Sequence, residues 1–230
     1  QCEIIGRVTG EKLVKIRRGE EQIGTVPPQS LVLGGGAPVY IREKTEPAYF
    51  RQMRRLDLSV YGEPDDYNKA VTQLLGSPNI CSRQWVTAQY DSMVRTNTVS
   101  DCYLDAAVIR LKETGTVLGM KTDCNSRYVY LDPYQGAMIA VAECARNLVV
   151  VGTRPLGVTN CLNFGNPYKP EIYWQFSESI RGIAEACTVL ETPVTGGNVS
   201  FYNENPEGAV YPTPVIGMVG EADSLDATMT

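Results

Sequence analysis

The stretch Lys121-Thr122-Asp123-Cys124-Asn125-Ser126-Arg127-Tyr128, with Asp132-Pro133 shortly after it, decides the fold of this 230-residue chain. An expected strand over residues 116–121 ends close to a carboxylate and is followed by a polar loop that contains an arginine. A helix then begins with aspartate as its N-cap and proline as its first residue. Strand, acidic loop and helix together form a place where a charged ligand can bind.

The helix expected from Pro133 to about Val149 has two distinct faces. One face is an apolar stripe, with side chains at spacings of four and three, and is predicted to pack on a core. The other face places two small residues ahead of a carboxylate and an amide, so that a partner can approach the backbone closely. The first stripe comprises Tyr134, Met138, Val141, Ala145 and Leu148, and the second Gly136, Ala140, Glu143 and Asn147.

Asp123, Glu143 and Asn147 together suggest a metal site. Oxygen ligands from separate elements are what Mg²⁺ bound to a nucleotide phosphate requires. The alternative interpretation is that Glu143 and Asn147 are solvated residues on an exposed helix face. The chain contains no histidine, which excludes Ser/His or Cys/His catalysis and any His-ligated zinc site within these 230 residues.

The segments on either side of this stretch predict one regular domain, residues 91–230. Lys112-Glu113-Thr114-Gly115 is expected to be the turn of a β-hairpin. The order β-β-α-β-α-β-β predicts an α+β domain with helices on one face of a mixed sheet. The remaining elements are expected as strands over 106–111, 156–162, 193–202 and 214–219 and as a helix over 170–190, whose inner face carries Ile172, Phe176, Ile180, Ile183 and Cys187.

The first 90 residues predict two simpler segments. Residues 1–41 read as a short β meander, and because the chain begins at Gln1 inside a strand pattern, we expect the carboxyl-terminal segment of a preceding domain. Residues 42–90 read as a linker with one or two helices, one of them over 65–75. The domain over 91–230 is expected to be truncated. The meander's strands are expected over 3–8, 12–17 and 22–26.

The composition is that of an ordinary soluble globular protein, with 43% hydrophobic and 20% charged residues. A formal net charge of −5 argues against a nucleic-acid surface, and the basic cluster from Arg51 to Arg55 predicts a solvated helix face. The apolar runs are too short to span a bilayer, so we expect a cytoplasmic protein without a membrane contact. The seven cysteines form no CxxC pair, which favours buried reduced thiols.

Two further motifs lie at strand ends. In Gly196-Gly197-Asn198-Val199-Ser200, the adjacent glycines mark either a β-bulge or a place where a ligand approaches the backbone. In the second case the backbone N–H groups can hold phosphate oxygens, with Asn198 and Ser200 helping. The segment 159–167 concentrates short polar residues at a strand end, where open α/β sheets place ligands; its alternative is an Asn-rich turn.

These motifs, occurring in order, resemble those of the phosphoribosylformylglycinamidine synthases. The resemblance implies a fold like the amino-terminal domain of aminoimidazole ribonucleotide synthetase, repeated in two halves of the enzyme. Residues 1–41 would then end the first half, and residues 91–230 would open the second. The motifs are Asp123 to Tyr128, Asp132-Pro133-Tyr134, Glu143, Asn147, Cys161-Leu162-Asn163-Phe164-Gly165-Asn166-Pro167 and Gly197-Asn198-Val199-Ser200-Phe201-Tyr202-Asn203-Glu204.

The resemblance also implies an activity in purine biosynthesis. ATP would phosphorylate the amide oxygen of formylglycinamide ribonucleotide, and ammonia from a glutaminase subunit would displace the phosphate to give the amidine. Mg²⁺ neutralises the triphosphate in such a transfer. The expected partners are the remaining domains, the glutaminase and a small accessory subunit. Because the chain is one half of a pseudo-symmetric pair of domains, a homodimer is also expected when the other half is absent.

The resemblance assigns roles by position. Asp123, Glu143 and Asn147 match positions that bind Mg²⁺ and the nucleotide phosphates of ATP or ADP. Asp105 stands where relatives place an acidic residue. Two positions depart from the pattern, since Asn160 replaces an aspartate and Leu104 a small residue. The family's catalytic histidine lies in the other half, so no catalytic residue is expected here. The expected phosphate-binding residues are Gly196, Gly197, Asn198, Ser200, Asn163 and Arg127.

Two alternatives remain beside this enzyme fragment. The chain can be a structural or dimerisation module whose polar residues bind no nucleotide. It can also be another member of the same ATP-binding superfold, such as a selenophosphate synthetase or a thiamine monophosphate kinase. The run Leu162-Asn163-Phe164-Gly165-Asn166 argues against the second alternative.

Overall fold

The computed structural model describes residues 4–31, 40–55, 57–101 and 104–229. The chain divides into two compact units, residues 1–41 and 42–230. None of the helices in these described ranges has the length and apolar composition that a membrane span needs.

In the first unit, strands β1 (Val14–Arg18) and β2 (Glu21–Val26) form an antiparallel hairpin that turns at Gly19. A short 3₁₀ helix, η1 (Pro28–Ser30), follows. The strands predicted over 12–17 and 22–26 are confirmed, but the strand predicted over 3–8 is wrong for residues 4–8, which have no regular structure. The predicted meander is therefore a hairpin, because two short strands offer residues 4–8 no buried surface on which to pack.

The linker contains more helices than predicted. Its described residues form α1 (Ala48–Met53), α2 (Tyr67–Leu75), α3 (Gln84–Thr87) and the 3₁₀ helix η2 (Leu58–Val60), and a further 3₁₀ helix, η3 (Val94–Thr96), follows the linker. The helix predicted over 65–75 is confirmed as α2, whose N-cap Asp66 accepts a hydrogen bond from the N–H of Lys69.

The second unit is built on a mixed sheet. Within the described residues it has six strands in the order β3-β4-β5-β10-β6-β7, so the strand that comes last in the sequence is central. Only β6 and β7 are parallel, and the other neighbouring strands of this described sheet are antiparallel. The strands are β3 (Thr98–Ser100), β4 (Ala107–Arg110), β5 (Val117–Asp123), β6 (Arg154–Asn163), β7 (Val194–Ser200) and β10 (Thr213–Ala222).

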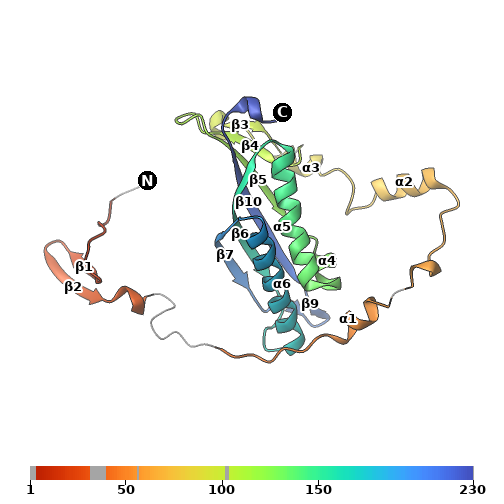
Figure 1. The fold of residues 1–230 in the computed structure, drawn as a ribbon, viewed down its shortest axis with the longest axis horizontal. Coiled ribbons are helices and arrows are strands. Elements are labelled where there is room, and N and C mark those ends of the chain that lie inside the picture. Colours follow the sequence, from red (N-terminus) through yellow and green to blue (C-terminus); the bar gives the residue numbers. More distant parts are fainter. Residues whose placement is uncertain (1–3, 32–39, 56, 102–103, 230) are drawn as a thin grey trace. The chain divides into compact units, whose positions relative to one another are not determined.

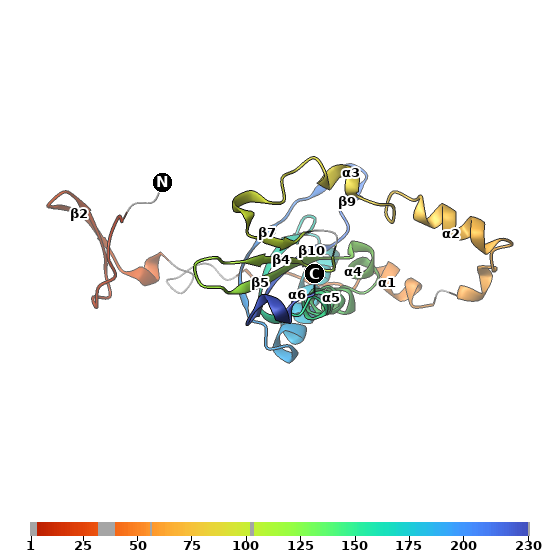
Figure 2. The same ribbon diagram turned by 90° about the horizontal axis from the view of Figure 1, so that it is seen from above.

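Helices α5 (Pro133–Val150) and α6 (Pro170–Val189) cover one face of this sheet, as Figures 1 and 2 show. The core lies between them and the sheet, where Leu148 of α5, Ile183 of α6 and Ile216 of β10 are buried together. Burial of one such side chain stabilises the fold by roughly 1.5–3 kcal/mol. The predicted α+β domain, with helices on one face of a mixed sheet, is confirmed.

Residues 126–131 correct one expectation from the sequence. The predicted polar loop is mostly a helix, α4 (Ser126–Leu131), because the Asn125 side chain caps it by accepting hydrogen bonds from the N–H groups of Arg127 and Tyr128. The small residue Gly136 of α5 is buried against this helix, since a Cβ there would lie 2.4 Å from the Val129 nitrogen. The partner that approaches the α5 backbone at Gly136 is therefore α4.

Three further elements had no counterpart in the prediction. They are edge strand β3, the small hairpin of β8 (Glu204–Asn205) and β9 (Gly208–Ala209), and the 3₁₀ helix η4 (Leu225–Ala227). All are too short to show a periodic pattern in the sequence.

Candidate functional site

The pairing register of the sheet brings the predicted site residues to one end of it. Asp123 on β5 is paired with Ile216 on β10, which is paired with Asn160 on β6, which in turn is paired with Gly197 on β7. Neighbouring strands are about 4.8 Å apart, so this row extends about 14 Å from Asp123 to Gly197. The row ends β5 and lies three residues before the ends of β6 and β7, and we call this end of the sheet, where the three strands finish, the carboxyl edge.

Asp123 and Asn147 meet at the carboxyl edge. The Asn147 Nδ2 donates a hydrogen bond to the Asp123 Oδ2 over 3.3 Å, and both side chains are half-buried. Glu143, also half-buried, lies one turn earlier on α5. The structure thus places a carboxylate and an amide from separate elements side by side, with a second carboxylate on the neighbouring turn.

Two thiols lie beside this pair. Burial, followed by the nearby Asp123 carboxylate, raises the pKa of Cys144 to about 12. Burial, followed by the same carboxylate, raises the pKa of Cys124 to about 11. Both thiols therefore stay protonated at neutral pH, and Cys144 donates to the Ile216 carbonyl oxygen over 3.5 Å. The prediction of buried reduced thiols is confirmed for Cys144 and Cys187.

Asp105 and Arg127 lie at the margin of the site. Asp105 precedes β4, which is antiparallel to β5, so it lies at the same end of the sheet as Asp123. Both Asp105 and Arg127 are exposed, and Arg127 belongs to the first turn of α4. In the described part of the chain, no group of three or more Cys, Asp or Glu side chains is arranged to hold a metal ion. The metal site expected from the sequence therefore stays a prediction.

The double glycine of β7 has a structural role. The pairing of β7 with β6 continues through it, with a register shift between Val158 and Thr159 of the kind that a β-bulge produces. At Gly197, φ is 155° and an added Cβ would lie 2.2 Å from the Asn160 Oδ1. Gly196 and Asn198 are exposed on this edge strand.

Asn163 and Ser200 make internal hydrogen bonds. The Asn163 Nδ2 donates to the carbonyl oxygens of Cys161 (3.0 Å) and Thr213 (3.2 Å), which joins the end of β6 to the start of β10. The Ser200 Oγ accepts from the Asn203 Nδ2 over 3.1 Å in the turn after β7. These bonds occupy the donor groups that a phosphate would need from Asn163.

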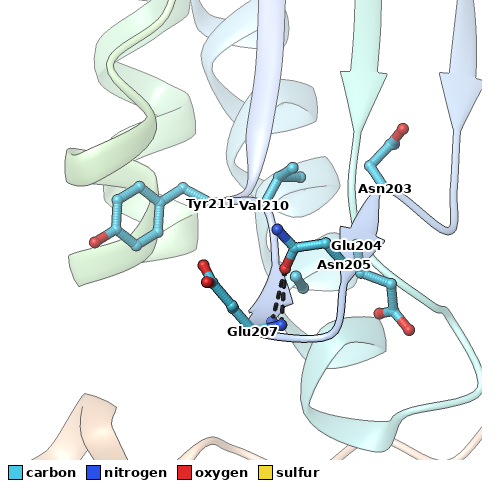
Figure 3. A pocket seen from close by; sticks show the side chains of 8 residues that line it. Asn203, Glu204, Asn205, Glu207, Val210 and Tyr211 are labelled. Atoms are coloured by element: carbon cyan, nitrogen blue, oxygen red, sulfur yellow. Dashed lines mark hydrogen bonds between the residues drawn. The ribbon is translucent and has the colours of Figure 1, made fainter.

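A pocket of about 640 Å³ adjoins the carboxyl edge (Figure 3), and the sequence reasoning missed it. It is lined by residues 203–205 and 207–211, which connect β7 to β10 through the β8–β9 hairpin. The Asn205 Oδ1 accepts from the N–H groups of Glu207 (2.9 Å) and Gly208 (3.2 Å), which fixes the tip of the hairpin. The signal that could have found the pocket is the acidic end of the motif, Asn203-Glu204.

The pocket is acidic and amide-lined. Glu204 is ion-paired with Lys169 over 3.0 Å, and this hydrogen bond, followed by one from the Asn166 N–H, lowers the pKa of the Glu204 carboxyl. Tyr202, two residues before Glu204, has a left-handed backbone with φ of 64°, which is uncommon for a bulky side chain. Carboxylate and amide oxygens suit a ligand group that donates hydrogen bonds, such as a hydroxyl or an amine.

Residues 103–222 match the protein-family model described as AIR synthase related protein, N-terminal domain. The chain belongs to this family. The matched range includes each predicted site residue, from Asp105 to Ser200.

Individual relatives assign the chain to a narrower group within this family. The chain is 55% identical over 228 residues to the phosphoribosylformylglycinamidine synthase subunit PurL of Chlorobaculum tepidum, and 54% identical over 220 residues to that of Moorella thermoacetica. These alignments cover 97% and 96% of the chain but 30% of each relative. The chain therefore spans about 30% of the length of the curated relatives that it matches. The resemblance stated from the sequence is confirmed, because the chain is a homologue of PurL.

Solved structures of this family agree with the fold. The PurL of Thermotoga maritima complexed with ADP is 27% identical, with a TM-score of 0.61, over 92% of this chain and 32% of that one. The PurLQS structure from the same organism is 28% identical, with the same TM-score and coverage. The predicted likeness to the aminoimidazole ribonucleotide synthetase amino-terminal domain is confirmed.

Proposed function

We propose that the chain is part of a phosphoribosylformylglycinamidine synthase and that its carboxyl edge binds a nucleotide with Mg²⁺. The observation that carries the proposal is the row from Asp123 to Gly197, with Asn147 beside Asp123. Polar groups from β5, β6, β7 and α5 converge there although they are far apart in the sequence. The T. maritima PurL structures complexed with ADP and with ATP support a nucleotide as the ligand class.

The proposed roles follow from the donor chemistry. Asp123, Glu143 and the Asn147 amide oxygen would hold Mg²⁺, which prefers oxygen ligands and takes the rest from phosphate and water. Rotation of the Asn147 amide by half a turn would present its oxygen instead of its nitrogen. Asp105 and Arg127 would contact the ligand from the margin. The proposed phosphate-binding residues remain Gly196, Gly197, Asn198, Ser200, Asn163 and Arg127, of which Asn163 would have to exchange its hydrogen bonds to Cys161 and Thr213 for the phosphate.

The activity of the whole protein belongs to the same proposal. ATP would activate the amide of formylglycinamide ribonucleotide, and ammonia from a glutaminase would complete the amidine. Bound Mg²⁺ would neutralise the phosphate charge in this transfer. The proposed partners are the remaining domains of the enzyme, the glutaminase and the small accessory subunit, and the PurLQS structure supports such an assembly. The proposed location is the cytoplasm.

Calorimetric titration of the chain with ADP, in Mg²⁺ and again in EDTA, tests the nucleotide site. Asp123→Asn is expected to weaken Mg²⁺-dependent binding about tenfold or more, because it removes the charge beside Asn147. Asp223→Asn is the matched control, since Asp223 is exposed just beyond the other end of β10. Equal affinities of Asp123→Asn and of the unchanged chain for ADP would show that Asp123 does not bind the ligand.

One observation favours a second candidate function, a pairing module without nucleotide binding. The face of the sheet opposite α5 and α6 carries exposed apolar side chains, including Met120 (37% exposed) and its register partner Val219 (38%). Such a face is typical of a surface that pairs with another domain or copy. A folded chain that gives no heat with ADP in Mg²⁺ would favour this candidate over the nucleotide site.

A further inference from the structure

Residues 42–54, which we call the clasp, dock on the domain although they belong to the linker. The Thr45 N–H donates to the Pro170 carbonyl oxygen over 3.2 Å, at the start of α6. Phe50 of α1 is only 7% exposed and makes an edge-to-face contact with Trp174 of α6, at a centroid distance of 5.1 Å. The Arg54 guanidinium lies 4.4 Å from the centroid of the Phe50 ring. The clasp is thus held by packing as well as by hydrogen bonds.

A stack of tyrosines continues from the clasp toward the carboxyl edge. Tyr49 of α1 is stacked on Tyr130 of α4, with centroids 4.1 Å apart and an interplanar angle of 8°. Tyr130 then contacts Tyr211, which lines the 640 Å³ pocket, at a centroid distance of 4.9 Å. The Gln175 Nε2 donates to the Tyr49 hydroxyl oxygen over 2.9 Å, which orients the ring. The last turn of α4 is therefore held between two aromatic side chains.

Asp132 joins the clasp to the elbow between α4 and α5. Its N–H donates to the Tyr128 carbonyl oxygen of α4, while its Oδ1 accepts from the Gln135 N–H in the first turn of α5. Its Oδ2 accepts from the Arg54 Nη2 over 3.0 Å. One carboxylate thus ends one helix, begins the next and binds the clasp. Arg54 stays exposed while it makes this ion pair, in agreement with the solvated face expected from the sequence for Arg51 to Arg55.

Helix α4 depends on such contacts for its position. It has six residues, of which only Val129 is buried within the described structure, and a helix of this length is not stable by itself. It also carries Arg127, and it begins three residues after Asp123. Loss of a contact that holds α4 would therefore change the positions of residues at the carboxyl edge.

We propose that the clasp positions α4 and, through it, the carboxyl edge, so that Arg54 and Tyr49 are positioning residues for the ligand. The first part rests on the contacts alone. The second part, the effect on a ligand, rests on the proposed nucleotide function. The inference gives the linker a role in ligand affinity without any contact to the ligand.

Hydrogen exchange of the full chain, together with ADP titration in Mg²⁺, tests this proposal. Arg54→Ala is expected to speed exchange of the amides of residues 126–131 several-fold, to leave the amides in the middle of α6 unchanged, and to weaken ADP binding roughly threefold to tenfold. Arg51→Ala is the matched control, because Arg51 is in α1, whose C-cap is Arg54, but is ion-paired with Glu46 of the linker over 2.7 Å. Arg54→Lys keeps the charge opposite Asp132 and is expected to restore much of the protection.

Each outcome of this experiment decides one part. Unchanged exchange in residues 126–131 of Arg54→Ala would overturn the positioning role. Faster exchange with unchanged ADP affinity would overturn the link to the carboxyl edge. If the unchanged chain binds no ADP, the proposed function fails, and the exchange comparison alone decides the positioning role. Tyr49→Leu, which removes the ring stacked on Tyr130, provides a second variant if Arg54→Ala does not fold.

Discussion

Gly196 and Gly197 are adjacent in β7 but differ in the space around them. An added Cβ at Gly197 would lie 2.2 Å from the Asn160 Oδ1 and 2.5 Å from the Asn160 carbonyl oxygen, while at Gly196 it would meet nothing within 4 Å. Gly197→Ala is therefore expected to destabilise the fold by about 1–3 kcal/mol, since both the φ of 155° and the contact oppose a side chain. Urea unfolding measures this change.

Gly196→Ala is the matched control for this prediction. It is expected to change the free energy of unfolding by no more than about 0.5 kcal/mol, because it adds a methyl group to an open position. Equal losses for the two variants would show that the Asn160 contact does not set the requirement for glycine. A ligand is not needed to explain Gly197.

Single residues of the candidate site were predictable only in part. Asp123, Asn147 and Gly197 stand out in the sequence because carboxylates, amides and paired glycines are rare in apolar periodic segments. The internal hydrogen bonds of Asn163 and Ser200 were not predictable, because their partners at Thr213 and Asn203 are set by the sheet order and by the turn after β7. Short polar residues at a strand end give the same pattern in both roles.

At the scale of elements, predictability followed length. Helices α5 and α6 and the β4–β5 hairpin were predicted because periodicity and turn residues are local signals. Helix α4 was missed because its position comes from Tyr49, Tyr211 and Arg54, which lie far from it in the sequence. The docking of the clasp was missed for the same reason.

The elbow between α4 and α5 supports a prediction at this scale. Asp132→Ala removes the N-cap of α5 and the partner of Arg54, and is expected to destabilise the fold by about 1–2 kcal/mol. Asp132→Asn keeps a side-chain oxygen for the Gln135 N–H and is expected to cost about 0.5 kcal/mol or less. Thermal unfolding of both variants measures the difference. If they lose the same stability, the charge rather than the cap is what Asp132 supplies.

At the scale of the whole molecule, the apolar face of the sheet predicts self-association. Val219→Glu places a charge in the middle of this face and is expected to shift the chain from dimer to monomer in sedimentation experiments. Val149→Glu is the control, because Val149 is more exposed (61%) but lies on α5. An unchanged chain that is monomeric at every concentration, or a Val219→Glu variant that still dimerises, contradicts this use of the face.

The class of fold was predictable at this scale, whereas the strand order was not. The alternation of strands and helices favours an α+β sheet, but many orders satisfy it. The position of β10 between β5 and β6 decides which residues become neighbours of Asp123, and it arises from pairings across 93–105 residues of sequence with β5 and 50–67 residues with β6.

The central position of β10 also determines when the domain can fold during its synthesis. Strands β5 and β6 each need β10 as a neighbour, so a nascent chain that has not yet released residue 222 from the ribosome holds two separate sheet halves. Helices α5 and α6 are complete by then, and the part of α5 that packs on β10 is still uncovered. Cotranslational folding of this domain therefore finishes in one late step, and until then the nascent chain presents the surface that chaperones bind.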